Sequence, residues 1–313
     1  MKKPIILFLF AALALSGCRK QVSDYERPHF DPQPTLNAVL QEGQPVWAQI
    51  TLAQCLDSVH PAPCTDAEVL LYVDGQFAEK LQHRGKGLYL GETRAEAFHE
   101  YACKVIVPGF DTLYASTEMP TSPRVFDVKV LEKALVNDEG QVCPAFLITF
   151  GNNPNQKQYF SASLDILMKW KDENKGNRDW IDGYYVNSST LSYSYQADDP
   201  VLLNEGSEML VFSNEIIRDT SYSLKVNNDY GPRDHSTALL GYVVAHMCGL
   251  SASAYHYIKS QNALNEPDAF TNLFLGVITP INLYSNVENG RGVFAAIAPM
   301  TCDTIFINPE NRN

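Results

Sequence analysis

A thiol that could be chemically modified stands near the start of the chain, at the end of the sequence Leu15-Ser16-Gly17-Cys18. The segment before it opens with two lysines and continues with an apolar run over residues 5–15. A basic start, an apolar run and small residues before the cleavage point are typical of a secretory signal peptide. The sequence therefore predicts that residues 1–17 are removed and that the chain is exported.

The cysteine after the small pair resembles a bacterial lipobox, which makes Cys18 the predicted site of lipid attachment. A diacylglyceryl cysteine, carrying fatty acids such as palmitate, would then be the first residue of the mature chain. Each buried CH₂ contributes ~0.8 kcal/mol, so two or more acyl chains hold a protein on a bilayer. The alternatives are an ordinary signal peptide cut elsewhere, or a membrane span, which needs ~20 apolar residues where this run has about half.

Six further cysteines suit an exported protein, because an even number of thiols in an oxidising compartment favours disulfides. Cys55 and Cys64 bracket a ten-residue loop that contains proline, and they are the predicted pair. Closing that loop would contribute roughly 2.7 kcal/mol in the chain-entropy model. The sequence leaves open the pairing of Cys103, Cys143, Cys248 and Cys302. The spacing of Cys and His residues matches no zinc motif, so we predict no metal and no cofactor.

Local signatures of catalysis are missing from the sequence, which holds no GxSxG, HExxH, phosphate-loop or helix-opening GxGxxG motif. Residues 234–236 read Asp-His-Ser, but a functional triad converges from separated segments, so this run carries no signal. His246 is predicted to be a hydrogen-bonded core residue. We predict no catalytic residue and no enzymatic activity, although 36 acidic residues leave a carboxylate pair open.

Aromatic residues in the middle of the chain are the candidates for ligand binding: Trp170, Trp180, Tyr184 and Tyr185. Exposed aromatic side chains are effective binding platforms for sugars or peptides. The favoured alternative is packing within a sheet, because residues 191–195 alternate like a half-buried strand. Residues 172–179 are polar, but their glycine does not fall at the sixth position of a calcium loop, so we expect a solvated loop.

The charge of the chain bears on its partners. Removing residues 1–17 takes away two of 24 basic residues and none of 36 acidic ones, which changes the net charge from −12 to −14. An acidic body argues against nucleic acid and anionic lipid headgroups as partners, since both attract Lys and Arg patches. Solubility alone would also explain the charge.

The elements that must carry these residues are mainly β-strands. A polar tether with three prolines is expected over residues 18–34. Short strands then follow at close spacing, and Asp74-Gly75 is a dipeptide favoured in tight turns. We predict an immunoglobulin-like or transthyretin-like sandwich over residues 35–120, with strands at 36–40, 46–52, 68–73, 77–81, 88–90, 101–107 and 112–116.

A boundary is predicted at residues 120–123, followed by a larger β-rich domain over residues 121–313. One helix is expected near residues 251–264, because apolar residues recur at helical spacing and Ser251 can cap the first turn. A polar excursion is expected at 169–182. The strands expected in this domain lie at 125–136, 145–150, 159–168, 191–195, 209–212, 222–226, 237–247, 283–285, 293–298 and 304–307.

Several stretches resemble the Bacteroidetes lipoproteins known as domain of unknown function 4249. Residues 101–120 match the family pattern YxLxVxxxGxxTLxAxTxxP, and residues 67–75 and 87–89 match its earlier AxVxLxxxG and Gly-x-Tyr elements. Residues 253–257 are similar to its YxYxxS helix. Residues 285–296, which read SNVENGRGVFAA, are similar to its closing SNIxNGxGxFxA motif. In that motif Asn289, Gly290 and Gly292 are predicted to form a tight turn with φ > 0 before Phe294 enters the core.

The resemblance implies an outer-membrane lipoprotein of a family often encoded beside TonB-dependent receptors. With the lipobox and the missing catalytic motifs, it predicts a non-catalytic accessory or ligand-capturing partner of a TonB-dependent transporter, bound to outer-membrane lipid through acylated Cys18. The alternatives are a structural or adhesive envelope lipoprotein and a lipid-tethered hydrolase. Arg19 and Lys20 follow Cys18 where a surface-export signal would place acidic residues, which leaves open the face of the membrane.

Overall fold

The computed structural model describes residues 31–54, 61–136, 140, 142–171, 180–188, 198–205, 210–227, 238–265, 282–301 and 305–306. The chain divides into two compact units, Met1–Asp31 and Pro32–Asn313, and the description that follows concerns the second. This unit is mostly β, as the sequence predicts. In the described part of the chain, no helix is long and apolar enough to span a membrane.

The first half of the unit is built from two sheets that share one hydrophobic core. Alternation of apolar and polar residues explains the strands, since Leu36, Ala38 and Leu40 of the first strand are buried and the residues between them are not. One sheet contains β1 (Pro34–Gln41), β2 (Pro45–Leu52), β3 (Ala62–Pro63), β6 (Gln82–Gly85) and β7 (Leu88–Arg94). The other has the order β5-β4-β8-β9, with β4 (Glu68–Val73), β5 (Gln76–Lys80), β8 (Glu100–Ile106) and β9 (Leu113–Glu118).

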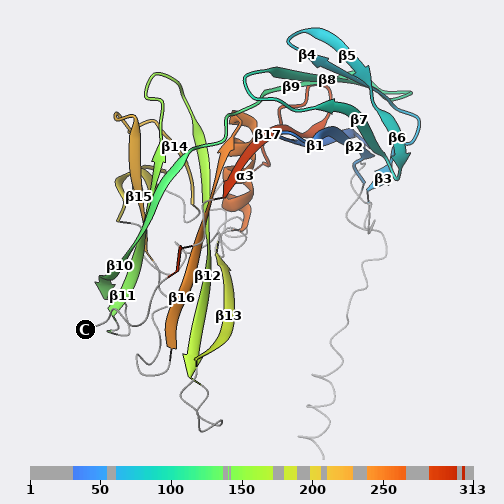
Figure 1. Cartoon of the computed structure of the whole chain (residues 1–313). Helices are drawn as coiled ribbons and strands as arrows, with labels where there is room; N and C mark the ends of the chain where they lie inside the picture. Colours follow the sequence, from blue (N-terminus) through green and yellow to red (C-terminus); the bar gives the residue numbers. More distant parts are fainter. Residues whose placement is uncertain are drawn as a thin grey trace, which may run out of the picture. The chain divides into compact units, whose positions relative to one another are not determined.

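The first sheet continues into the second half of the chain. Its strand order is β13-β12-β16-β17-β1-β2-β7-β6, where β12 is Tyr159–Lys171, β13 is Trp180–Ser188 and β16 is Ala238–Leu250. Strand β17 (Arg291–Thr301) runs parallel to β1, with Leu36 opposite Gly292 and Leu40 opposite Ala296. Figure 1 shows β17, in red, between β16 and the blue strand β1. One sheet therefore crosses the boundary that the sequence predicts at residues 120–123, and the immunoglobulin-like or transthyretin-like identity of residues 35–120 stays a prediction.

Both faces of β17 are buried. Phe294, Ala296 and Ala298 belong to the core of the first half, together with residues of β1, β2, β4, β7, β8 and β9. Val293 and Ala295 belong to a separate cluster under helix α3 (Ala252–Asn265). A central strand covered on both sides reads as an apolar run with small residues, which is the character of the sequence Val293-Phe294-Ala295-Ala296.

The second half has its own core, in which Phe150, Phe160 and Phe212 pack with ring centroids 5.1–5.8 Å apart. It lies between a three-stranded sheet, β10-β11-β15, and the far end of the long sheet. The strands are β10 (Val125–Val136), β11 (Val142–Gly151), β12 (Tyr159–Lys171), β13 (Trp180–Ser188), β14 (Val211–Ser213), β15 (Ser221–Asn227), β16 (Ala238–Leu250) and β18 (Ile305–Phe306).

Several sequence expectations are corrected by the structure. Residues 282–287 form no strand, so the one expected at 283–285 is wrong. Helix α2 (Pro200–Glu205) was not expected, although Asp199 caps it by accepting a bond from the Val201 N–H at 2.9 Å. The polar excursion is shorter than expected, because β12 extends to Lys171 and β13 begins at Trp180. The strand expected at 191–195 lies outside the described residues.

Residues 289–292 bring the chain to β1 through two close approaches, at Gly290 and at Gly292. Asn289 has φ 59° and Gly292 has φ 110°, so both adopt the left-handed region. A Cβ on Gly292 would lie 2.1 Å from the Leu36 carbonyl oxygen, which leaves no room for a side chain. A Cβ on Gly290 would lie 2.7 Å from the Pro34 carbonyl oxygen, so a side chain has no room there. Gly290 does not have the positive φ that the sequence predicts, and it is the lack of space that requires glycine.

We predict that Gly292→Ala lowers the free energy of unfolding by roughly 3 kcal/mol or more, because it adds a backbone clash to an unfavourable φ. Gly43→Ala is the matched control, since Gly43 has φ 75° but open space around it, and it should cost about 1 kcal/mol. Urea unfolding of the two variants measures the difference. Equal losses would show that β17 does not lie tightly against β1.

Candidate functional site

A hollow with a volume of about 550 Å³ lies between β9 and the start of α3. We call it the β9–α3 groove. Its lining comes from segments far apart in the sequence, including β9, residues 156–160, the end of β16 and residues 284–286. Ligand sites prefer such hollows between structural units, so this groove is the candidate functional site.

Three buried hydroxyl groups form the floor of the groove. The Ser251 Oγ accepts hydrogen bonds from the N–H groups of Ala254 at 3.2 Å and Ala296 at 3.0 Å, so its own proton goes to the Ser253 Oγ at 2.9 Å. The Ser253 hydroxyl donates to the Phe294 carbonyl at 3.0 Å, and it therefore accepts from Thr117 at 3.0 Å. All three hydroxyl protons are committed to structural bonds. The bond from Ser251 to Ala254 also confirms the predicted N-cap of α3.

One wall of the groove is aromatic. Tyr159 stacks on Tyr255 with ring centroids 4.5 Å apart and an interplanar angle of 29°. His256 lies edge-on to Tyr255 at 5.2 Å and tilted to Tyr284 at 5.4 Å. Lys157 holds its ammonium group 5.5 Å from the centre of the Tyr159 ring. Tyr159 and Tyr284 thus present rigid ring surfaces to the hollow.

The opposite rim is acidic. Glu100 and Glu118 are directly opposite each other on β8 and β9, and both line the groove together with Asp74. Like charges at opposite positions of a ladder cost stability, by about 0.2–1 kcal/mol. A hydrogen bond with His99 at 2.6 Å and one from the Glu100 N–H at 3.0 Å hold the pKa of the Asp74 carboxyl below its usual value. The rim therefore carries negative charge at neutral pH.

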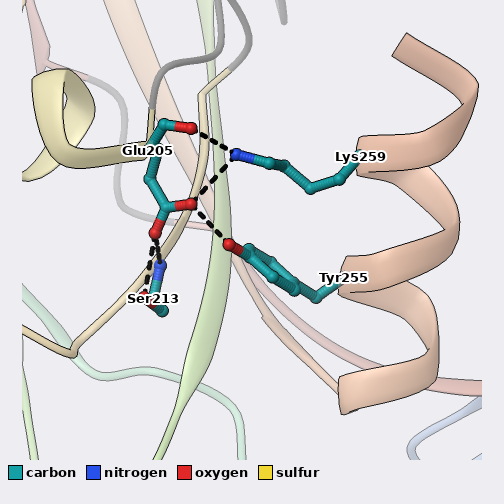
Figure 2. A network of polar contacts seen from close by, with 4 residues as sticks. All are labelled: Glu205, Ser213, Tyr255 and Lys259. Atoms are coloured by element: carbon teal, nitrogen blue, oxygen red, sulfur yellow. Dashed lines mark hydrogen bonds and ion pairs between the residues drawn. The ribbon is translucent and has the colours of Figure 1, made fainter. Parts of the chain in front are cut away.

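A buried carboxylate fixes α3, and with it the aromatic wall. The Glu205 side chain, only 4% exposed, lies at the end of α2 between β14 and α3 (Figure 2). One carboxylate oxygen accepts from the Ser213 N–H at 2.6 Å and the Ser213 hydroxyl at 2.9 Å. The other accepts from the Tyr255 hydroxyl and from Lys259 Nζ at 3.1 Å. Lys259 also donates to the Glu205 carbonyl at 2.6 Å.

These contacts change the acidity of their members. Burial alone would raise the pKa of the Glu205 carboxyl, but hydrogen bonds from Tyr255, Ser213 and Lys259 outweigh it and hold that pKa below its usual value. Burial and the neighbouring carboxylate together raise the pKa of the Tyr255 hydroxyl. The carboxylate and the protonated phenol therefore stabilise each other at neutral pH.

The aromatic candidates from the sequence lie on two neighbouring strands, β12 and β13. Trp170 is on β12, and Trp180, Tyr184 and Tyr185 are on β13. Their backbones pair in the ladder, with Trp170 opposite Ile181 and Ala238 and Tyr185 opposite Leu167. Their side chains lie outside the described part of the structure, so their role in binding stays a prediction. The Asp-His-Ser run at 234–236 and the segment 172–179 are also outside it.

The cysteines are thiols where the structure describes them. Among the described residues, no disulfide joins Cys64, Cys103 or Cys248, so no pairing among these three is seen. Cys143 is buried on β11. Burial raises the pKa of the Cys103 thiol to about 12 and that of Cys248 to about 11, which makes both poor nucleophiles. Cys18, Cys55 and Cys302 lie outside the described residues, so lipidation and the pairing of Cys55 with Cys64 stay predictions.

His246 is hydrogen-bonded as the sequence analysis expects, but it is not a core residue, since its side chain is 33% exposed. Its Nε2 lies 2.8 Å from Asp165 Oδ2, across the ladder between β16 and β12. Neither residue lines the β9–α3 groove, so this pair ties two strands together rather than facing a ligand there. Within the described ranges, no group of three or more His, Cys, Asp or Glu residues could hold a metal ion.

The groove residues were missed by sequence reasoning. Tyr159 and Ser253 were assigned only to a strand and a helix, and Glu205 was assigned to no element. The available signal was the family resemblance over residues 253–257, which contains Ser253 and Tyr255. It did not indicate that these residues meet β9 and residues 284–286, because those contacts depend on long-range pairing.

Replacing Ser253 tests the hydroxyl floor. Ser253→Ala removes the acceptor of two buried hydroxyl protons and one donor to Phe294, so we expect a loss of about 1–3 kcal/mol in unfolding free energy. The control is Ser223→Ala, which breaks an exposed hydroxyl pair with Thr149 at 2.8 Å and should change stability by a few tenths of a kcal/mol, roughly. Chemical denaturation compares them, and a harmless Ser253→Ala would contradict the assigned network.

The Glu205 contacts predict a pH dependence. Because the folded-state pKa lies below the ordinary 4.5, the carboxylate stabilises the fold above that pH, and its contribution disappears as the pH falls through the folded-state pKa. Glu205→Gln should therefore lower the free energy of unfolding by about 1–3 kcal/mol at pH 7. The variant should also lose less stability than wild type when the pH falls from about 5 to about 3. Unfolding curves at several pH values measure this. The exposed control Glu92→Gln should keep the wild-type profile, and an unchanged profile for Glu205→Gln would refute the assignment.

Comparison with known proteins identifies a family but no activity. No curated protein matches the sequence. The family model described as Domain of unknown function (DUF4249) matches residues 22–302, which is most of the chain. The chain therefore belongs to the DUF4249 family.

Proposed function

We propose that this protein is an outer-membrane lipoprotein, anchored through acylated Cys18, that captures a ligand without catalysis as the accessory partner of a TonB-dependent transporter. The observation that carries the proposal of ligand capture is the β9–α3 groove, a hollow of about 550 Å³ with an aromatic wall and a charged rim. The anchor is supported by the sequence Leu15-Ser16-Gly17-Cys18 after a basic and apolar leader. An exported chain would also meet an oxidising compartment, where pairing of Cys55 with Cys64 is expected.

Capture without chemistry is supported by the state of the hydroxyl groups in the groove. A nucleophilic hydroxyl needs a base that takes its proton. Thr117 and Ser251 instead donate their hydroxyl protons to the Ser253 oxygen, and Ser253 donates its own proton to the Phe294 carbonyl. These groups are used to hold β9, α3 and β17 together, and the ring faces and carboxylates remain for contact with a ligand.

The form of the groove also suits a carrier. Rigid rings lose little conformational entropy when they bind, and the Glu205 contacts fix α3 before a ligand arrives. Charged groups on a rim steer encounter more than they add affinity. A lipid-held body with such a groove would raise the local concentration of ligand near a transporter in the same membrane.

Purification from the native membrane tests this proposal. In mild detergent, wild-type protein should copurify with a β-barrel receptor, and its mature N-terminal peptide should carry the mass of a diacylglyceryl group on Cys18. Cys18→Ala should lose the acyl mass, membrane retention and the receptor, whereas the control Gln21→Ala should keep all three. Isolation of the acylated protein alone at full yield would refute the transporter partnership, and an unacylated wild-type terminus would refute the anchor.

A further inference from the structure

A second hollow, of about 440 Å³, lies on the outer face of the sheet β5-β4-β8-β9. The inner face of this sheet is buried in the first core through Val69, Leu71 and Val105. The outer face carries the alternate residues, among them Tyr72 on β4, Ala102 on β8 and Tyr114 on β9. We call this hollow the outer trough, and it is separate from the sandwich core.

The trough has aromatic banks and a floor of small residues. Tyr72, Ala102 and Ser116 stand in one row across the sheet, so Ala102 and Ser116 leave a low floor beside the Tyr72 ring. Tyr114 forms the other bank and is 43% exposed. Phe77, which is 58% exposed, packs edge-on against Tyr72 with centroids 5.8 Å apart. Because β8 separates β4 from β9, and Tyr114 lies two residues along β9 from the row of Tyr72, the two banks are about 10 Å apart across the sheet and about 7 Å apart along it.

Polar groups stand beside the rings. The ammonium group of Lys104 lies 5.7 Å from the centre of the Tyr114 ring. Residues 286–288 run along β9 as an additional edge, with Glu288 and Tyr114 joined by backbone bonds of 2.8 and 3.4 Å. Glu288 therefore brings a carboxylate to the trough, opposite in sign to Lys104. The site offers apolar ring surface, one positive group and one negative group.

These features exclude most occupants. An extended peptide adds to the edge of a sheet through main-chain bonds, but the trough lies on a face, and the edge of β9 is already bonded at Glu288. An acyl chain would desolvate Lys104 and Glu288 without hydrogen-bonding them. A polyanion would meet a chain whose net charge is −12. The remaining fit is a neutral molecule with apolar C–H faces for the rings and hydroxyl groups for both charged side chains.

We propose that the outer trough binds a neutral oligosaccharide, with one sugar ring against Tyr114 and another against Tyr72. Sugar rings present C–H groups to aromatic faces, and their hydroxyls both donate and accept hydrogen bonds. Across and along the sheet together, the two banks are about 12 Å apart, which matches sugars that are not adjacent in a chain. The inference goes beyond ligand capture in the β9–α3 groove, because it concerns a second hollow that shares only Ser116 and Asn286 with the lining of the groove.

Calorimetric titration of the full mature chain with neutral tetrasaccharides of glucose, mannose, xylose and galactose tests the proposal. At least one should bind, and Tyr114→Ala or Tyr72→Ala should weaken it by roughly tenfold or more, through loss of a stacked ring. Tyr114→Phe keeps the ring and should retain binding. Phe110→Ala is a control, since Phe110 is 37% exposed but does not line the trough.

Failure of this proposal is distinct from failure of the proposed function. Binding of no tetrasaccharide, or equal binding by Tyr114→Ala and wild type, would overturn the assignment. Binding only of acidic saccharides or of peptides would overturn it as well. A thermal melting curve shows whether Tyr114→Ala is folded. If it is not, the proposal is tested by weaker binding of Tyr72→Ala and retained binding of Tyr114→Phe. Copurification with a receptor should be unaffected by either tyrosine variant.

Discussion

The parallel pairing of β17 with β1 is the constraint on which the rest of the structure depends. Seven positions pair in register, from Thr35 with Arg291 to Gln41 with Ile297, although the strands are about 250 residues apart in the chain. The pairing places Phe294 and Ala296 in the core of the first half and Val293 and Ala295 under α3. The hydrophobic core of residues 34–118 is therefore incomplete without β17, which supplies Phe294 and Ala296. Gly292 makes this possible, because any side chain there would meet the Leu36 carbonyl.

The same strand assembles the candidate functional site. The Asn286 side chain accepts from the Phe294 N–H at 2.9 Å and donates to the carbonyls of Phe294 and Ser116, which holds residues 284–288 between β17 and β9. The β9–α3 groove lies on one side of this segment and the outer trough on the other, and both are lined by Ser116 and Asn286. The segment around Asn286 thus has a structural role between two hollows. Binding in either hollow is our proposal, and the fold explains why both depend on one segment.

The sequence predicts local structure well where one face of an element is buried. Alternation predicts β1, β2, β8 and β12 to within a few residues, and Ser251 with the spacing of Tyr257 and Ile258 predicts α3. It fails at residues 283–285, which form no strand: Tyr284 lines the groove, and Leu283 is an apolar residue exposed at the surface. The pairing of β1 with β17 cannot be predicted from either strand alone. The hydrophobic pattern of each sequence shows that it is a strand but not which strand it pairs with. For the same reason the groove cannot be predicted from the sequence, since its walls come from several segments that only long-range strand pairing brings together.

Hydrogen exchange tests the central claim most directly. Amide protons of β1 and β2 should be among the slowest to exchange in the full chain, because β1 is covered by strands on both sides. In a chain that ends after residue 282, which lacks β17, the same amides should lose most of their protection while β11 and β15, which pair with each other, keep more of theirs. Unchanged protection of β1 in the shortened chain would show that the first half folds without β17 and would contradict this account.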